Sequence, residues 1–93
     1  MNKVKLYFEK ALTNLAGYEF GIEVYEEQVK GKIDINREFI IEFPEQIKVV
    51  ASSFVQGFFE EIVNSIGLLA TEERTVIVSN NEKIVKTLIK KLQ

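Results

Sequence analysis

Two adjacent serines, Ser52 and Ser53, are the residues of this chain whose placement most favours chemistry. They follow an apolar stretch, and the residues after them repeat at helical spacing: Phe54, Val55, Phe58, Phe59, Ile62, Val63 and Ile66. The first amides of a helix lack intrahelical partners, and the positive end of its dipole favours an anion. The pattern therefore predicts two hydroxyls at the N-terminus of a helix at 53–66, where a serine commonly serves as the N-cap.

The composition of the chain lacks the residues that most catalytic and metal sites use. The chain contains no histidine and no cysteine, which excludes Ser–His and Cys–His nucleophiles and the commonest zinc sites. Adjacent helical residues point in different directions, so each acidic doublet predicts a solvated face rather than a paired site. The doublets are Glu26-Glu27, Glu60-Glu61 and Glu72-Glu73. We therefore expect no enzymatic activity, no metal site and no cofactor.

Length and charge narrow the class of protein. The 93 residues are predicted to form one domain, 1–93, and a net charge of −2 argues against general nucleic-acid binding. No apolar run approaches the roughly 20 residues that span a bilayer, and the N-terminal residues do not resemble a secretory signal. We therefore expect a cytoplasmic protein with no membrane segment.

The serine pair must be positioned by an alternation of strands and helices. Apolar runs predict strands at 4–8, 39–43 and 75–79, and apolar stripes predict helices at 17–30, 53–66 and 82–92. Gly17 and Gly21 weaken the first helix and favour a start near Tyr18. Residues 32–35 are compatible with an edge strand or a loop. The order β-α-β-α-β-α predicts a small α/β domain with a mixed or mostly parallel sheet and helices packed on it.

Some residues of these elements are expected in the core and others at the surface. The predicted core includes Ile40, Phe58, Ile62, Ile77 and Leu88. Gly57 interrupts a strong helical stripe, which indicates either a close backbone approach or contact with a partner. Packing against the sheet is the favoured explanation.

The segment Ala51-Ser52-Ser53-Phe54 resembles the corresponding turn of STAS-like domains, relatives of the anti-sigma factor antagonists. Those antagonists have Asp-Ser-Ser-Gly at this turn, and one serine accepts a phosphate. The chain is more similar to a STAS-like branch that has Ser-Ser-Phe there and whose role is unassigned. The resemblance extends over about 33–88. It implies a STAS-like fold and a phosphoacceptor at Ser53, or at Ser52.

Two functions are compatible with these observations. The first is a non-enzymatic protein–protein interaction module, a bacterial partner-switching regulator whose partner is an anti-sigma-like or histidine-kinase-like ATPase. Its partner contacts are expected at Phe54, Gln56 and Gly57. The alternative is a small structural or homodimerising domain that uses an exposed edge strand such as 3–8. In that case the serines serve only as helix caps.

Overall fold

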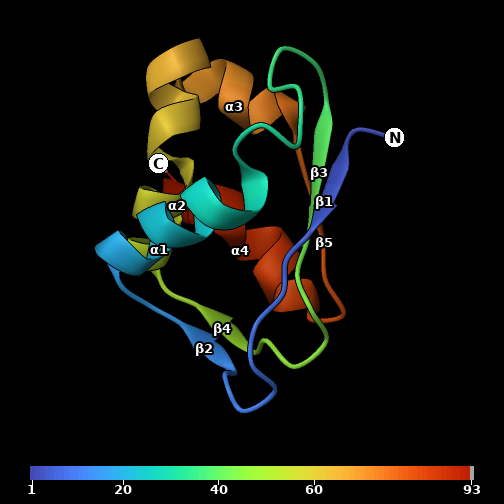
Figure 1. Ribbon diagram of the computed structural model, residues 1–93, viewed down its shortest axis with the longest axis vertical. Helices are drawn as coiled ribbons and strands as arrows, with labels where there is room; N and C mark the ends of the chain where they lie inside the picture. The colour runs from blue at the N-terminus through green and yellow to red at the C-terminus, as the bar shows by residue number, and fades with distance from the viewer. Residues whose placement is uncertain (93) are drawn as a thin grey trace.

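Two parallel sheets and a group of helices make up the computed structural model, which describes residues 1–92 (Figure 1). The strands are β1 (Lys3–Lys5), β2 (Asn14–Leu15), β3 (Phe39–Glu42), β4 (Val49–Val50) and β5 (Thr75–Val78). The helical segments are α1 (Tyr18–Val24), the π-helical turn η1 (Tyr25–Val29), α2 (Ser52–Ile66), α3 (Leu68–Arg74) and α4 (Glu82–Leu92). The larger sheet has the order β1-β3-β5, and β2 pairs with β4. All these pairings are parallel, which confirms the predicted α/β class.

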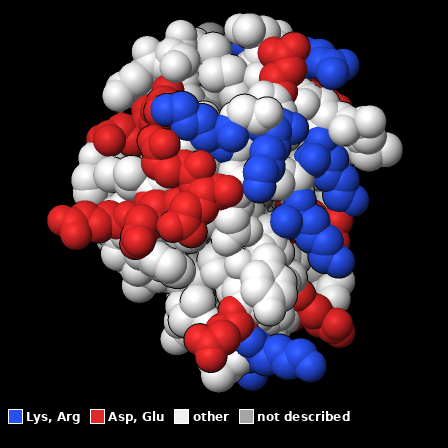
Figure 2. Space-filling view, viewed as in Figure 1, with Lys and Arg blue, Asp and Glu red and all other residues white. Residues whose placement is uncertain are grey.

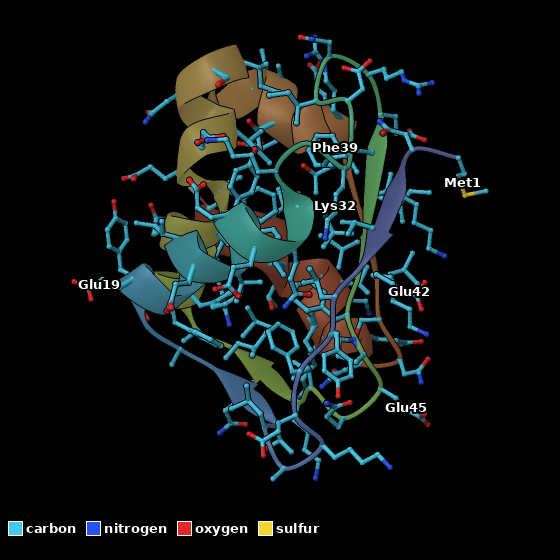
Figure 3. The ribbon with its side chains drawn as sticks, in the orientation of Figure 1. Met1, Glu19, Lys32, Phe39, Glu42 and Glu45 are labelled. Atoms are coloured by element: carbon cyan, nitrogen blue, oxygen red, sulfur yellow. The ribbon has the colours of Figure 1, made fainter. Side chains whose placement is uncertain are left out.

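The three-stranded sheet is covered by helices on one face only (Figure 1). Phe39 and Ile41 of β3 are fully buried on that face, and Ile41 lies between Val4 of β1 and Ile77 of β5. The opposite face presents Glu42, which Figure 3 shows on the other side of the strand from Phe39. The sheet therefore contributes every second residue to the core.

This alternation corrects one predicted core residue. Ile40 lies on the uncovered face and is only half-buried, because its neighbours in sequence point toward the helices. The other predicted core residues, Phe58, Ile62, Ile77 and Leu88, are buried as expected.

The helices α1 and α2 cross in close contact at two glycines. A Cβ atom on Gly57 would meet the carbonyl oxygen of Tyr18 and would lie 2.9 Å from its carbonyl carbon. A Cβ atom on Gly21 would meet the carbonyl oxygen of Phe54 and would lie 2.7 Å from the amide nitrogen of Phe58. Gly57 is therefore explained by the backbone of α1, and the expectation that it packs against the sheet is wrong.

Several elements differ from the predicted ones. The predicted helix at 17–30 begins at Tyr18 and ends in the π-helical turn η1, and residues 32–35 form no strand. The short strands β2 and β4 and the helix α3 were not predicted. Gly67 does end α2, but α3 starts at the next residue. The last helix has the predicted bounds, and the side chain of Asn81 caps it by accepting the amide of Lys83 at 3.0 Å.

In the extended segment that follows β1, a side chain forms hydrogen bonds with the main chain at Tyr7. The amide of Tyr7 donates to Oε1 of Gln28 at 2.7 Å, and Nε2 of Gln28 donates to the carbonyl of Tyr7 at 2.9 Å. The side chain of Gln28 thus makes the two bonds that a neighbouring strand would make at this residue.

Candidate functional site

The serine pair lies in the first turn of α2, one residue later than a capping position. The N-cap is Ala51, which is extended (φ −73°, ψ 154°) and has no side chain able to cap. The first helical bond runs from the amide of Val55 to the carbonyl of Ala51 at 3.1 Å. Ser52 and Ser53 are therefore helical residues, and the prediction that one of them caps the helix is wrong. The amides of residues 52–54 have no partner inside the helix.

The hydroxyl of Ser53 contacts the start of the other crossing helix. Its Oγ accepts a hydrogen bond from the amide of Gly17 at 2.9 Å, and Gly17 is the N-cap of α1. The pairing of β2 with β4 brings these segments together, since the amide of Ala51 donates to the carbonyl of Leu15 at 2.8 Å. Ser53 thus joins the N-terminal ends of α1 and α2 by one side-chain bond.

Exposed apolar and polar side chains lie on the first turns of α1 and α2 and on the residues that lead into these helices. We call the set the α2 entry surface, and it consists of Ala16, Tyr18, Val49, Ser52, Ser53 and Gln56. Tyr18 is 43% exposed to solvent and Val49 is 47% exposed, although both are large hydrophobic residues. Ser52 and Ser53 are both exposed. The surface therefore combines hydroxyl groups with accessible apolar area.

The three predicted partner contacts divide between surface and core. Phe54 is 1% exposed, and Gly57 is covered by α1, so neither presents a contact surface. Gln56 is exposed, but its Nε2 already donates to the carbonyls of Lys91 at 2.9 Å and Leu92 at 3.3 Å. Of these three residues only Gln56 can touch a partner without a rearrangement of the core.

Negative charge is absent from the first turn of α2 and concentrated elsewhere. The first turn contains no acidic residue. Exposed carboxylates gather instead over α1 and η1, where Figure 2 shows an acidic band, and Glu19 projects outward in Figure 3. The hydroxyl of Tyr18 donates to Glu60 of α2, and this hydrogen bond raises the pKa of Tyr18 above its ordinary value.

A second cluster of interacting charges lies where η1 meets α2. Nζ of Lys30 lies 3.2 Å from Oε1 of Glu61 and 3.6 Å from Oε2 of Glu26. The hydrogen bond to Glu61 and the charge of Glu26 raise the pKa of Lys30. Tyr25 is buried beside them, and burial, together with the charge of Glu61, raises its pKa to about 12. These groups stabilise the packing of η1 on α2 and do not line the α2 entry surface.

Residues 1–92 contain no group of three or more acidic side chains arranged to hold a metal ion. Within the same residues, no helix has the length and apolar character needed to cross a membrane.

The sequence did not indicate Gly17 and Tyr18 as parts of the site. Gly17 has a positive φ of 104°, which glycine adopts readily, and its amide donates to Ser53. A glycine directly before a predicted helix was the available signal, but only the pairing of β2 with β4 shows which hydroxyl it meets.

Comparison with known proteins identifies the family of the chain. No curated protein and no solved structure matches the chain significantly. A family model matches residues 21–86, which include β3, β4, β5 and the whole of α2 with its serine pair. Since the match covers well over half of the chain, this protein belongs to the family of STAS-like domains of unknown function, DUF4325.

Proposed function

We propose that this domain is a non-enzymatic protein-interaction module whose binding to a partner protein is controlled at Ser53. The observation that supports this most is the exposed hydroxyl of Ser53, which bonds the amide of Gly17 and joins two helix ends within a partly apolar surface. A covalent change at this oxygen would alter the surface at its centre. The core beneath, formed by Phe54 and Phe58, would keep its packing.

The surroundings of Ser53 favour phosphorylation as that change. A phosphate adds a charge of about −1.5 to −2 and three strong acceptors. The unpaired amides of the first turn and the helix dipole stabilise an anion there, and the first turn has no acidic side chain to repel one. The amide of Gly17 could donate to a phosphate oxygen in place of the hydroxyl. The fold would therefore tolerate the modified residue. Ser52 is also exposed and is the second candidate acceptor.

The kind of partner comes from the resemblance to the anti-sigma factor antagonists. It supports a bacterial, cytoplasmic partner switch in which the α2 entry surface binds an anti-sigma-like or histidine-kinase-like ATPase when Ser53 is unmodified. Tyr18, which follows Gly17, and Val49 of β4 would supply apolar contact area. A negative charge on Ser53 would then lie within the interface, where an unpaired charge is costly.

The test compares partner recovery by wild-type protein with recovery by Ser53→Asp. The helix dipole favours an aspartate in the first turn of α2, and its carboxylate can accept a hydrogen bond from the amide of Gly17. The variant should therefore remain folded. We expect a loss of partner affinity of more than about tenfold, or 1.4 kcal/mol.

The matched control is Ser65→Asp, which makes the same change on an exposed serine near the other end of α2. It should retain the partner. Ser53→Ala should also retain it, since it adds no charge. Equal recovery by folded Ser53→Asp and wild-type protein would refute control at Ser53 and would favour the alternative, a structural or homodimerising domain.

A further inference from the structure

A groove with an apolar floor lies between β4 and α4, and it adjoins the α2 entry surface at Val49. Its volume is about 230 Å³. Val50, Ile84 and Leu88 form the floor and are nearly fully buried by their own neighbours, whereas Val49 is 47% exposed at its margin. The groove is therefore large enough for one or two apolar side chains of another molecule.

Three lysines surround this floor. Lys48 and Lys83 both line the groove, and Asn81 connects their main chains: its Nδ2 donates to the carbonyl of Lys48 at 3.0 Å and its Oδ1 accepts the amide of Lys83 at 3.0 Å. Lys91 lies two helical turns away, and its Nζ donates to the carbonyl of Val50 at 2.6 Å. The groove is thus lined by apolar side chains together with Thr87 and three lysines.

Lys48 and Lys83 differ from Lys3 and Lys30, whose ammonium groups are paired with carboxylates. Lys3 pairs with Glu42 at 2.7 Å, and Lys30 pairs with two carboxylates. Among residues 1–92, neither Lys48 nor Lys83 forms an ion pair. A group of uncompensated positive charges on a protein of net charge −2 is complementary to an acidic ligand.

We infer that this groove binds an acidic amphipathic helix of a partner protein. The lysines at 83 and 91 are eight residues apart on α4, which corresponds to about 12 Å. A partner helix with apolar residues one turn apart, and carboxylates about two turns apart, would match the floor and the charges together.

An added β-strand fits less well than a helix. The carbonyls of Lys48 and Val50 already accept the side chains of Asn81 and Lys91. A strand that paired along this side of β4 would have to share these carbonyls with both side chains. Helix-in-groove binding needs no backbone bonds from β4.

The inference rests on the proposed function for the class of partner, a protein, and it does not require phosphorylation. The probe is a synthetic helical peptide of about 14 residues with leucines one turn apart and glutamates about two turns apart, capped at both ends. It is titrated into isotopically labelled protein and followed by NMR. We expect saturable shifts at Val49, Ile84 and Leu88, and binding that weakens as salt concentration rises. The same peptide with lysine in place of glutamate should not bind.

Variants separate groove binding from general charge attraction. Lys48→Glu and Lys83→Glu should each weaken peptide binding by about tenfold or more. Lys86→Glu is the matched control, because it makes the same charge change on α4 at an exposed position outside the groove. It should change the affinity less than threefold.

Three outcomes would overturn the inference: no saturable shift up to about 1 mM peptide, shifts away from the groove, or an equal effect of Lys83→Glu and Lys86→Glu. The test of Ser53 uses partner recovery and no lysine variant. One hypothesis can therefore fail while the other holds.

Discussion

The crossing of α1 and α2 allows a sharp prediction, the effect of Gly57→Ala. Alanine has the higher helix propensity, and on local grounds the change should stabilise α2 by about 1 kcal/mol. The structure predicts the opposite sign. The added Cβ would meet the carbonyl oxygen of Tyr18, and it would lie 2.9 Å from the carbonyl carbon of Tyr18 and 3.1 Å from the amide nitrogen of Ile22.

The size of the stability loss depends on whether the atoms that obstruct the new Cβ can move. Overpacking of a core ordinarily costs about 1–3 kcal/mol, and part of the strain is usually relieved by rotation of a side chain. Here the obstructing atoms belong to the backbone of α1, so relief requires the two helices to separate. The separation would loosen Phe54 and Phe58, which pack beneath the crossing. We therefore expect overpacking to cost about 2–3 kcal/mol, and the net loss to be about 1–2 kcal/mol after the gain of about 1 kcal/mol in helix propensity.

Urea denaturation of wild-type protein and Gly57→Ala measures this loss directly. In a separate thermal denaturation, the melting temperature should fall by at least about 4 °C, because a loss of about 1 kcal/mol lowers it by about 4–8 °C in a domain of this size. Ser65→Ala is the matched control, because it changes an exposed residue of the same helix and should be neutral or slightly stabilising. If Gly57→Ala were as stable as wild-type protein, the close approach of α1 and α2 would be wrong, and so would the position of Gly17 beside Ser53.

Two further predictions concern burial and pH. Ile62→Ala should cost about 2–5 kcal/mol because Ile62 is fully buried, whereas Ile40→Ala, on the uncovered sheet face, should cost less than about 2 kcal/mol; equal losses in urea denaturation would contradict the assignment of these faces. The pKa of Tyr25 rises from 10.0 to about 12 on folding, so the folded state favours the neutral phenol. This contribution to stability is complete below pH 10 and is lost as the pH rises through about 12. An absorbance titration should therefore show a last tyrosine ionisation that Tyr25→Phe removes, and its persistence in the variant would refute the assignment.

The parts of the fold that could be predicted are those with unambiguous periodicity. The helix α4 has one apolar stripe and an asparagine cap, and its bounds were predicted correctly. Strand β3 was predicted in place, but its run Phe39-Ile40-Ile41 is apolar at every position. The sequence therefore could not show which residues face the helices. That choice is made by the register with β1 and β5.

The site was predicted in part, for similar reasons. The position of the serine pair at the start of a helix was correct to within one residue, since the change of periodicity marks that boundary. The cap was wrong, because Ala51 leaves β4 in an extended conformation and becomes the N-cap itself. The sequence did not show that Phe54 is buried or that Gly57 lies against α1, because this crossing also requires Gly21, a residue distant in sequence.

The two departures from the antagonist turn have different consequences in the folded chain. A phenylalanine in place of glycine beside Ser53 would be expected to hinder a modifying enzyme. The ring of Phe54 instead points inward, with its centroid 5.6 Å from that of Phe58 and 5.7 Å from that of Phe20 of α1. The ring of Phe54 packs the first turn of α2 against Phe20 of α1 and does not cover Ser53.

The alanine in place of aspartate leaves the residue before the pair uncharged, so no carboxylate there would repel a phosphate on Ser53. Neither departure obstructs Ser53, and its hydroxyl accepts a hydrogen bond from the amide of Gly17. In the proposed control, a phosphate on Ser53 would still accept the amide of Gly17, and its charge, not the loss of this bond, would change the α2 entry surface. This is why Ser53→Asp should change binding at the α2 entry surface with little effect on folding.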